Sequence, residues 1–458
     1  MLRNMPAGRQ GAKVAPAALL SHHIKANILT IFPHQKSVQL NYLLFAVYLV
    51  ILCSLMLRVP FIKNCGINSG TLLTLFLIKI LAGIAIGWIS IHIYGPGNDY
   101  WDVNDFAREE YQLLHTNPGR YFINIFTSDY QGGYAGMFSS GDSYWNDLKG
   151  NIVIKLVSIF NIFSRGDYYI NSLFFNFIIF FGHIILYRLF IKLFPGKQLW
   201  VIVGCFLLPS MLYFSSGIHK DGVVFLMMAV IVYTVYQSLL KNAFSVKRIL
   251  LISVSLALLF LVRNFVLLAL LPALFAWILS AKTKWNAAIV FTAVYALSAL
   301  IFFNISSINP EINPPAIITE KQAAYRSLPV AATQIELTPL QPTFKGFAAN
   351  APQASMHVLL LPYPGMQPNS LLPFSFELVF YIFLLLRLFF FWRKKDIISD
   401  KAFLFFLLFF TFTVFLFIGY IVPNIGSLVR YRSLLLPLII TPLLCSIGWK
   451  SLKKINEL

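Results

Sequence analysis

The chain has 458 residues, of which 58% are hydrophobic and only 12% are charged, and its mean hydropathy is +0.73. A soluble globular chain carries roughly 25% charged residues, so this composition excludes a soluble enzyme and a disordered chain. The net charge of +19 does not indicate nucleic-acid binding, because Lys and Arg also gather at the cytoplasmic ends of membrane helices. We therefore expect an all-α polytopic membrane protein that contacts membrane lipids and no nucleic acid.

Eleven apolar segments are candidates for membrane-spanning helices, which need about 20 mostly apolar residues each. Arg263 and Asn264 interrupt the stretch 249–280 near its middle. This stretch is too long for one span and short for two, so we predict a tight hairpin of two short helices. The segments are 41–57, 71–94, 168–190, 198–217, 222–240, 249–262, 264–280, 286–305, 374–392, 402–422 and 428–448.

Two segments that do not resemble membrane helices organise the chain. A basic N-terminal segment, 1–40, precedes the predicted transmembrane core 41–305, which contains the acidic loop 95–165. A Pro-rich segment, 306–373, then leads to the C-terminal helices and basic tail of 374–458. Its many prolines predict a mostly irregular cap with short helices over the bundle.

Basic residues in short loops predict the orientation, because cytoplasmic loops carry an excess of Lys and Arg. Five clusters of basic residues can all lie on the cytoplasmic side of the membrane only if the stretch 249–280 is a hairpin. The acidic loop, residues 218–221 and the segment 306–373 then lie outside, and the C-terminus lies inside. The basic residues 1–40 contradict this map: either the rule fails there or one early segment does not span. The clusters are Arg188, Lys192 and Lys197; Lys241, Lys247 and Arg248; Lys282 and Lys284; Arg393, Lys394 and Lys395; and Lys450, Lys453 and Lys454.

Three carboxylates follow the second span at a spacing of three residues: Asp99, Asp102 and Asp105. They share one face if the segment is helical. Such a cluster can bind a divalent cation, with Asp99 and Asp102 as the candidate ligands, or raise one pKa enough for a general base. The aromatic residues between them suit a sugar face or an interface belt. The structural alternative is the solvated start of an amphipathic helix.

A second polar group, His219, Lys220 and Asp221, joins two spans on the same predicted face. A compact cation at a membrane interface suits a lipid phosphate, and we expect Asp221 to orient Lys220. The alternative is a snorkelling Lys beside a counter-ion. Arg263 lies between apolar residues, and an intramembrane Arg is a functional candidate because it is costly to bury; its alternative is a hairpin tip at the headgroup level.

Arg430 and Arg432 are expected at the outer start of the last span, where a helix N-terminus and bidentate guanidinium groups favour a phosphate. Positions two apart do not share a helix face, so one of the two is expected to bind phosphate and the other to pack against the external segment. Interface anchoring is the alternative. The sequence contains no CxxC, HExxH or Walker motif that would indicate a metal or nucleotide site.

A resemblance to a known family rests on these motifs. Asp102-x-x-x-Phe106-Ala107, just after a span, resembles the Asp-x-x-x-Tyr-Ala pattern of GT-C-type glycosyltransferases, with Phe106 at the Tyr position. Lys220-Asp221 and Arg430-Tyr431 resemble motifs in a short loop and near the C-terminus of such proteins. The resemblance implies a bacterial plasma-membrane enzyme with its active site on the extracytoplasmic face and an Asp, here Asp102, as base or metal-linked acid.

The resemblance also implies the substrates: a polyprenyl-phosphate-linked sugar as donor and a glycan, lipid or protein as acceptor. Two alternatives remain open. A polysaccharide polymerase or ligase of another fold uses external Arg and His side chains and needs no Asp cluster. A transporter or flippase for lipid-linked sugars should show paired broken spans in corresponding halves, a symmetry that we do not find in the sequence.

Overall fold

The computed structural model describes residues 34–124, 144–283, 285–391 and 400–447. In these ranges all regular elements are helices, and an isolated antiparallel bridge pairs Gln334 with Asn424. Within this described part of the chain, eight helices are long and apolar enough to cross a membrane, or up to ten if each of two bent helix pairs is one span. The predicted all-α polytopic membrane fold is confirmed, whereas the count of eleven spans stays a prediction.

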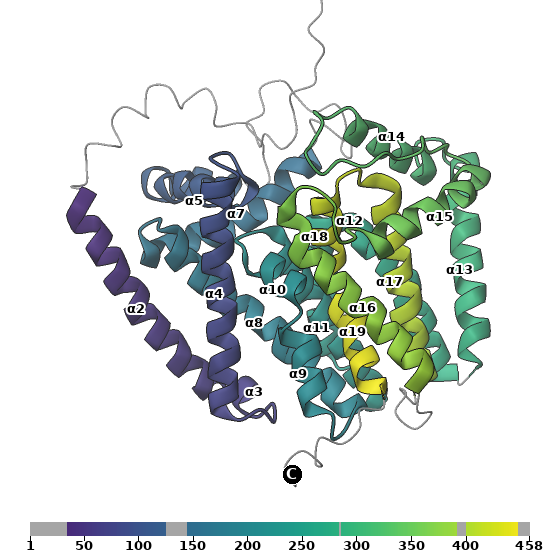
Figure 1. Cartoon of the computed structure of the whole chain (residues 1–458), viewed down its shortest axis with the longest axis horizontal. Coiled ribbons are helices and arrows are strands. Elements are labelled where there is room, and N and C mark those ends of the chain that lie inside the picture. Colours follow the sequence, from purple (N-terminus) through teal and green to yellow (C-terminus); the bar gives the residue numbers. More distant parts are fainter. Residues whose placement is uncertain (1–33, 125–143, 284, 392–399, 448–458) are drawn as a thin grey trace, which may run out of the picture.

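The N-terminal part of the bundle carries the acidic segment at one of its ends (Figure 1). We call this end, where α5 and α7 lie beside the last turns of α4, the α5 end. The helices are α2 (His34–Arg58), α3 (Pro60–Lys63), α4 (Ser69–Ile93), α5 (Asp99–Thr116), α6 (Pro118–Ile123), α7 (Tyr144–Ser164), α8 (Tyr168–Leu193), α9 (Gln198–Phe206), α10 (Pro209–Ser216) and α11 (Lys220–Leu240).

Helix α5 begins sharply because Asn98 caps it. The Asn98 side chain accepts hydrogen bonds from the backbone N–H groups of Tyr100 and Trp101, at 3.2 Å each, which satisfies donors that a helix start leaves unpaired. The same side chain donates to the carbonyls of Ser90 and Gly95. These bonds tie α5 to the end of α4 and fix where its first-turn carboxylates lie.

The long element α12 (Val246–Thr283) is the predicted hairpin. Arg263, near its middle, has φ −150° and ψ 79°, which breaks the helix. The two ends of α12 meet, since the Lys282 ammonium lies 5.1 Å from the ring centre of Phe244, just before the element starts. A straight helix of 38 residues would hold its ends roughly 57 Å apart. The chain therefore reverses at Arg263, which forms the hairpin tip.

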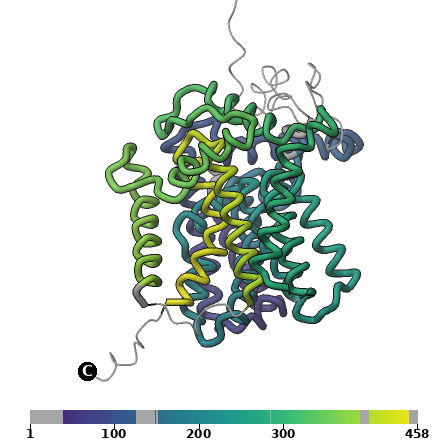
Figure 2. Tube along the Cα trace, turned by 90° about the vertical axis from the view of Figure 1, so that its right-hand side faces the viewer, coloured from purple at the N-terminus to yellow at the C-terminus, as the bar shows by residue number. Residues whose placement is uncertain are grey.

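The C-terminal part, from α13 onward, supplies a cap and five further α-helices, as Figures 1 and 2 show in outline. Two helices of 13 and 17 residues, α14 and α15, make the segment 306–373 more helical than its prolines predicted, because Pro314 and Pro315 occupy the first turn of α14, where no N–H partner is lost. The elements are α13 (Ala287–Asn304), η1 (Ile305–Ser307), α14 (Pro314–Arg326), α15 (Phe344–Leu360), η2 (Asn369–Leu371), α16 (Leu372–Phe391), α17 (Lys401–Ile421), α18 (Ile425–Ser433) and α19 (Leu436–Ser446).

Two of the predicted spans are broken rather than continuous. Segment 198–217 consists of α9 and α10, bent by 46°, and the last segment consists of α18 and α19, bent by 64°. Pro209 and Pro437 each lie in the first turn of the second helix of a pair, and a proline cannot continue the helix that precedes it. Each of these two broken spans therefore consists of two short helices. Polar groups lie at the ends of these short helices, inside the bundle.

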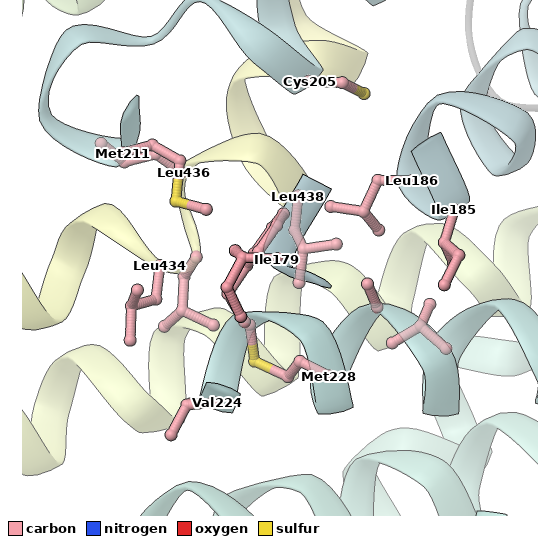
Figure 3. Close-up of a cluster of buried hydrophobic side chains, with 14 of the residues drawn as sticks. Ile179, Ile185, Leu186, Cys205, Met211, Val224, Met228, Leu434, Leu436 and Leu438 are labelled. Carbon is pink, nitrogen blue, oxygen red and sulfur yellow. The ribbon is translucent and has the colours of Figure 1, made fainter. Parts of the chain in front are cut away.

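The core lies where these broken helices pack against α8 and α11 (Figure 3). Ile179, Met211 and Met228 come together there with Leu434 and Leu438, and all are at most 3% exposed. By contrast, only 11% of the most apolar window is buried in α2 and in α13. These two helices form the outer edges of the bundle in Figure 1, so their apolar residues are available to lipid.

Helices α15 and α17 approach closely at Gly419. A methyl group added to Gly419 would overlap the backbone carbonyl of Ala354. We expect Gly419→Ala to destabilise the protein by about 1–3 kcal/mol, because backbone atoms cannot move aside as a side chain can. Thermal unfolding in detergent measures this. Gly70→Ala is the control, since its nearest neighbour is a side-chain oxygen at 3.6 Å. Equal unfolding temperatures for the two variants would contradict this packing.

The basic clusters that the structure describes gather at the end opposite α5. Lys192 lies close enough to Arg188 and Lys241 for their charges to interact, and the contact of Lys282 with Phe244 brings a third cluster there. The clusters at 393–395 and 450–454, together with Lys284, lie outside the described residues. The separation of basic and acidic ends that the sequence predicts is therefore present in the described part of the fold.

Candidate functional site

Polar side chains from four helices meet at the α5 end of the bundle. Asp99 lies in the first turn of α5, His219 and Asp221 flank the start of α11, Arg263 forms the α12 tip, and Arg430 lies in the last turn of α18. We call these five residues the arginine–aspartate cluster. All five were candidates in the sequence: Asp99 from the carboxylate cluster, His219 and Asp221 from one polar group, and Arg263 and Arg430 from two further places in the chain.

Asp221 is the centre of the cluster and is completely buried. Arg263 donates to its Oδ1, and the Arg430 Nε donates to its Oδ2 at 2.5 Å. A buried carboxylate needs such partners, because desolvation of an unpaired charge costs several kcal/mol. The sequence predicted that Asp221 orients Lys220; the structure instead makes it the shared counter-ion of two arginines.

Arg430 links the buried carboxylate to the acidic helix. Its Nη1 donates to Asp99 Oδ2 at 2.9 Å, and its Nη2 lies 2.7 Å from the His219 Nε2. The Nδ1 of His219 lies 2.6 Å from the same Arg430 Nη2 and 3.0 Å from Asp221 Oδ2, so the ring is held between a guanidinium and a carboxylate. Burial and the charge of Arg430 lower the pKa of His219 to about 4, which agrees with a neutral ring.

Asp99 faces the solvent side of the cluster, with 46% of its side chain exposed. Partial burial alone would raise its pKa, but His219 and Arg430 outweigh that effect and lower the pKa to about 2. The group is therefore an ionised carboxylate held by a guanidinium. Half-exposed pairs of this kind contribute at most about 1 kcal/mol to stability.

Asp102 lies one turn further along α5 and is half-buried. Burial, together with the like charges of Asp99 and Asp105, raises its pKa. Among the described residues it has neither a salt bridge nor a hydrogen bond through its side chain. Asp105 is exposed and lies 3.8 Å from Arg108, away from the arginines of the cluster. Burial raises the pKa of Asp105 as well, so of the three carboxylates Asp99 is the ion-pair partner of Arg430, whereas Asp102 and Asp105 both have raised pKa values.

Two cationic groups beside Asp221 retain unused donors. Lys220 is partly exposed and has no hydrogen-bond or salt-bridge acceptor among the described residues, although it is close enough to Arg263, Arg430 and Asp221 for charge interactions. The Nε of Arg263 is buried and has no acceptor within the described part of the chain. Three basic side chains thus face the two carboxylates Asp99 and Asp221, which leaves an excess of positive charge.

A small apolar crevice of about 10 Å³, which has room for about one water molecule, begins at Arg263 and Tyr431. The Arg263 guanidinium lies 4.0 Å from the ring centre of Tyr431, a cation–π contact that holds its plane. Behind these two groups the crevice is lined by side chains of α11, α12 and α17 and by the break between α18 and α19. The apolar lining residues are Val224, Met228, Phe265, Val266, Val414, Ile418, Leu434 and Leu435.

Arg432 does not join the cluster. It is 3% exposed, and its Nη1 donates to the carbonyls of Val358 and Leu361 at the end of α15, at 2.5 and 2.8 Å. The expectation that Arg430 and Arg432 face different partners is confirmed. The expectation that a helix begins at these two arginines is wrong. Helix α18 begins earlier, at the Asn424 cap, and both arginines lie in its last turn.

Sequence reasoning missed the aromatic part of the site. Tyr431 was noted only as a neighbour of the arginines. Tyr100 was one of the aromatic residues expected at a sugar face or an interface belt, and its ring instead packs edge-on against His219 at 5.8 Å. Among the described residues, no group of three or more His, Cys, Asp or Glu side chains is placed to hold a metal ion. A divalent cation at Asp99 and Asp102 therefore finds no third ligand of these types there.

The arrangement can bind an anion at the boundary of an apolar crevice and, one helical turn from Asp99, accept a proton at Asp102. No family model matches the chain, and no curated protein or solved structure is similar to it at a significant level.

Proposed function

We propose that the protein is a membrane glycosyltransferase that moves a sugar from a lipid-phosphate carrier to an acceptor hydroxyl. The observation that carries the proposal is the convergence of Lys220, Arg263 and Arg430 on one buried carboxylate, Asp221, at the mouth of an apolar crevice. A phosphate fits the excess positive charge, and guanidinium groups bind it in bidentate fashion. The lipid chain of the carrier would stay in the bilayer beside the bundle, because the crevice has a volume of only about 10 Å³.

In this proposal Asp102 accepts the proton of the acceptor hydroxyl. The oxygen of that hydroxyl then attacks the anomeric carbon of the donor sugar. The bond between that carbon and the phosphate oxygen breaks, and the electron pair leaves with the lipid phosphate. Lys220, Arg263 and Arg430 stabilise the departing charge. Mass spectrometry of polyprenyl-linked sugars and of glycans, with and without the protein, tests the proposal. Unchanged pools of both would contradict it.

A second candidate is a polysaccharide polymerase or ligase, which acts on lipid-pyrophosphate substrates. The contact of Arg430 with His219 favours it, because such enzymes use external Arg and His side chains. Under this alternative Asp102→Asn keeps normal activity, whereas His219→Gln and Arg430→Lys abolish it. A flippase would instead move a fluorescent lipid-linked sugar across a vesicle membrane without forming a new glycosidic bond.

We expect Lys220→Ala to raise the apparent KM for the lipid-phosphate donor about tenfold and to change kcat less. The reason is that an ammonium without another acceptor contributes to phosphate binding both before and during the reaction. A donor titration with the reconstituted protein measures both constants. Lys241→Ala, at the opposite end of the bundle, is the matched control. A KM that stays at the wild-type value in Lys220→Ala would exclude the phosphate role.

The proposal places the cluster on the extracytoplasmic side of a bacterial plasma membrane, because positively charged loops stay in the cytoplasm. We expect a cysteine at Thr116 in α5 to react with an impermeant maleimide added to intact cells. A cysteine at Ala243, between α11 and α12, should react only after lysis. Both sites are exposed, and the four native cysteines are replaced beforehand. If the cysteine at Ala243 reacted in intact cells and the one at Thr116 only after lysis, the orientation in the membrane would be the reverse of the proposed one.

A further inference from the structure

Helix α10 joins the core of the bundle to the arginine–aspartate cluster. It has only eight residues, and a helix of this length has little stability of its own. It packs against α4, α16 and α18. Within five residues of its end at Ser216, the chain reaches His219 and then Asp221. The helices that hold α10 therefore also decide where these two side chains of the cluster lie.

A buried lysine holds the C-terminal end of α10. Lys79, in α4, is 1% exposed. Its Nζ donates to the hydroxyls of Ser215 and Ser216 at 3.0 and 3.1 Å and to the Ser215 carbonyl at 3.4 Å. These three acceptors match the three N–H donors of an ammonium group. The side chain of Asn176, in α8, donates to the Ser216 carbonyl at 2.8 Å, so two of the carbonyls that a helix end leaves unpaired have partners.

A buried glutamate holds the N-terminal end of α10. Leu208, the residue before the helix, provides no side-chain cap. Glu377, in α16, provides one instead: its two carboxylate oxygens accept from the Ser210 N–H at 3.1 and 3.2 Å, and its Oε1 accepts from the Ser210 hydroxyl at 3.1 Å. Tyr381, one turn further along α16, donates to the same Oε1. Glu377 is 6% exposed, and such donors are what a buried carboxylate needs.

The two groups suit the opposite ends of α10. Aligned backbone dipoles favour an anion at the start of a helix and a cation at its end, and Glu377 and Lys79 occupy those places. The length of α10, eight residues, separates the two ends by roughly 12 Å. Gly83, one turn after Lys79 in α4, lets α10 come close, since an added Cβ would lie 3.2 Å from the Ser216 carbonyl oxygen. Helix α10 is therefore the element that connects the two groups.

The link from α10 to the cluster is short and tightly packed. It consists of residues 217–219. Gly217 packs against the ring of Tyr100, where an added Cβ would lie 2.4 Å from a ring carbon, and Ile218 is completely buried. Close-packed groups transmit a displacement to their neighbours. A shift of α10 would therefore move His219, whose Nε2 lies 2.7 Å from Arg430.

We propose that Lys79 and Glu377 are positioning residues, which hold α10 at both ends and thereby place the start of α11 beside Arg430. Within the described part of the chain, their hydrogen bonds go to α10 and, for Glu377, to Tyr381, and none goes to the cluster itself. The positioning role follows from the geometry of the cluster, whereas its effect on donor binding rests on the proposed function.

Hydrogen exchange of the full-length protein in detergent tests the positioning role without any substrate. Lys79→Met keeps the apolar stem and removes the donors, so we expect peptides within 209–222 to exchange about tenfold faster while α17 keeps its rate. Glu377→Gln keeps the shape and still accepts a bond, so it should fold readily and accelerate the same peptides about threefold. Lys155→Met is the matched control, because Lys155 is also buried but is bonded to Glu110, in α5. It should leave 209–222 unchanged.

Donor kinetics provide a second readout, which a purely structural role would not move. If Lys79 acts through the placement of Lys220, Lys79→Met should raise the donor KM about tenfold and change kcat less. The double variant Lys79→Met/Lys220→Ala should then raise the KM no further than Lys220→Ala alone, because both changes remove the same interaction.

Two results would overturn the proposal. One is exchange at the wild-type rate within 209–222 in both Lys79→Met and Glu377→Gln. The other is equal acceleration of these peptides in Lys155→Met, which would mean that any loss of a buried lysine loosens the region. Faster exchange in the first two variants, in a protein that transfers no sugar, would keep the positioning role and reject the proposed function. The two failures are therefore distinguishable.

Discussion

Asp221→Asn is expected to destabilise the folded protein by about 3–5 kcal/mol, the largest stability loss that the structure predicts. The substitution keeps the shape of the side chain but removes the charge shared by Arg263 and Arg430, and it leaves both guanidinium groups facing a neutral amide. Thermal unfolding of the purified protein in detergent, together with the yield of folded protein, measures the effect. Asp99→Asn is the matched control, because Asp99 is half-exposed and should cost no more than about 1 kcal/mol.

The cause of the loss can be separated from simple misfolding. If unpaired buried arginines are responsible, then adding Arg263→Gln to Asp221→Asn should recover part of the stability, since one of the two uncompensated charges is removed. No recovery in the double variant, or an unfolding temperature of Asp221→Asn equal to that of Asp99→Asn, would contradict the role of Asp221 as the shared counter-ion.

Asp102→Asn is expected to lower the rate of sugar transfer about 100-fold or more while the protein folds normally. Asparagine has almost the same shape as aspartate and cannot accept the proton. Burial and the charges of Asp99 and Asp105 raise the pKa of Asp102, so the wild-type rate should fall as the pH drops through that raised value. Single-turnover transfer from a lipid-phosphate donor measures the rate.

The control for Asp102 is Glu109→Gln, which makes the same chemical change at an exposed position of the same helix. It should transfer sugar at the wild-type rate. If Asp102→Asn also transfers at that rate, the proton acceptor is another group. Asp99 would then be the next carboxylate to test, although its pKa of about 2 makes it a weak base while Arg430 holds it.

The sequence by itself determined the class of fold and several local features. Hydrophobicity and the scarcity of charge required a helical bundle in lipid, because only helices satisfy their own backbone hydrogen bonds there. The length of the stretch 249–280 and the polar break within it predicted the hairpin with Arg263 at its tip. The spacing of Arg430 and Arg432 predicted different partners for the two side chains. Each of these inferences depends on residues close together in the chain.

Only the tertiary structure decided which of the candidate residues meet. Arg430 bonds to Asp221 and Asp99 across 209 and 331 residues, and no local spacing encodes such a pairing. The choice of Asp99 rather than Asp102 as the partner of Arg430 depends on how α5 is rotated against α11 and α18. That rotation results from the packing of all the helices together.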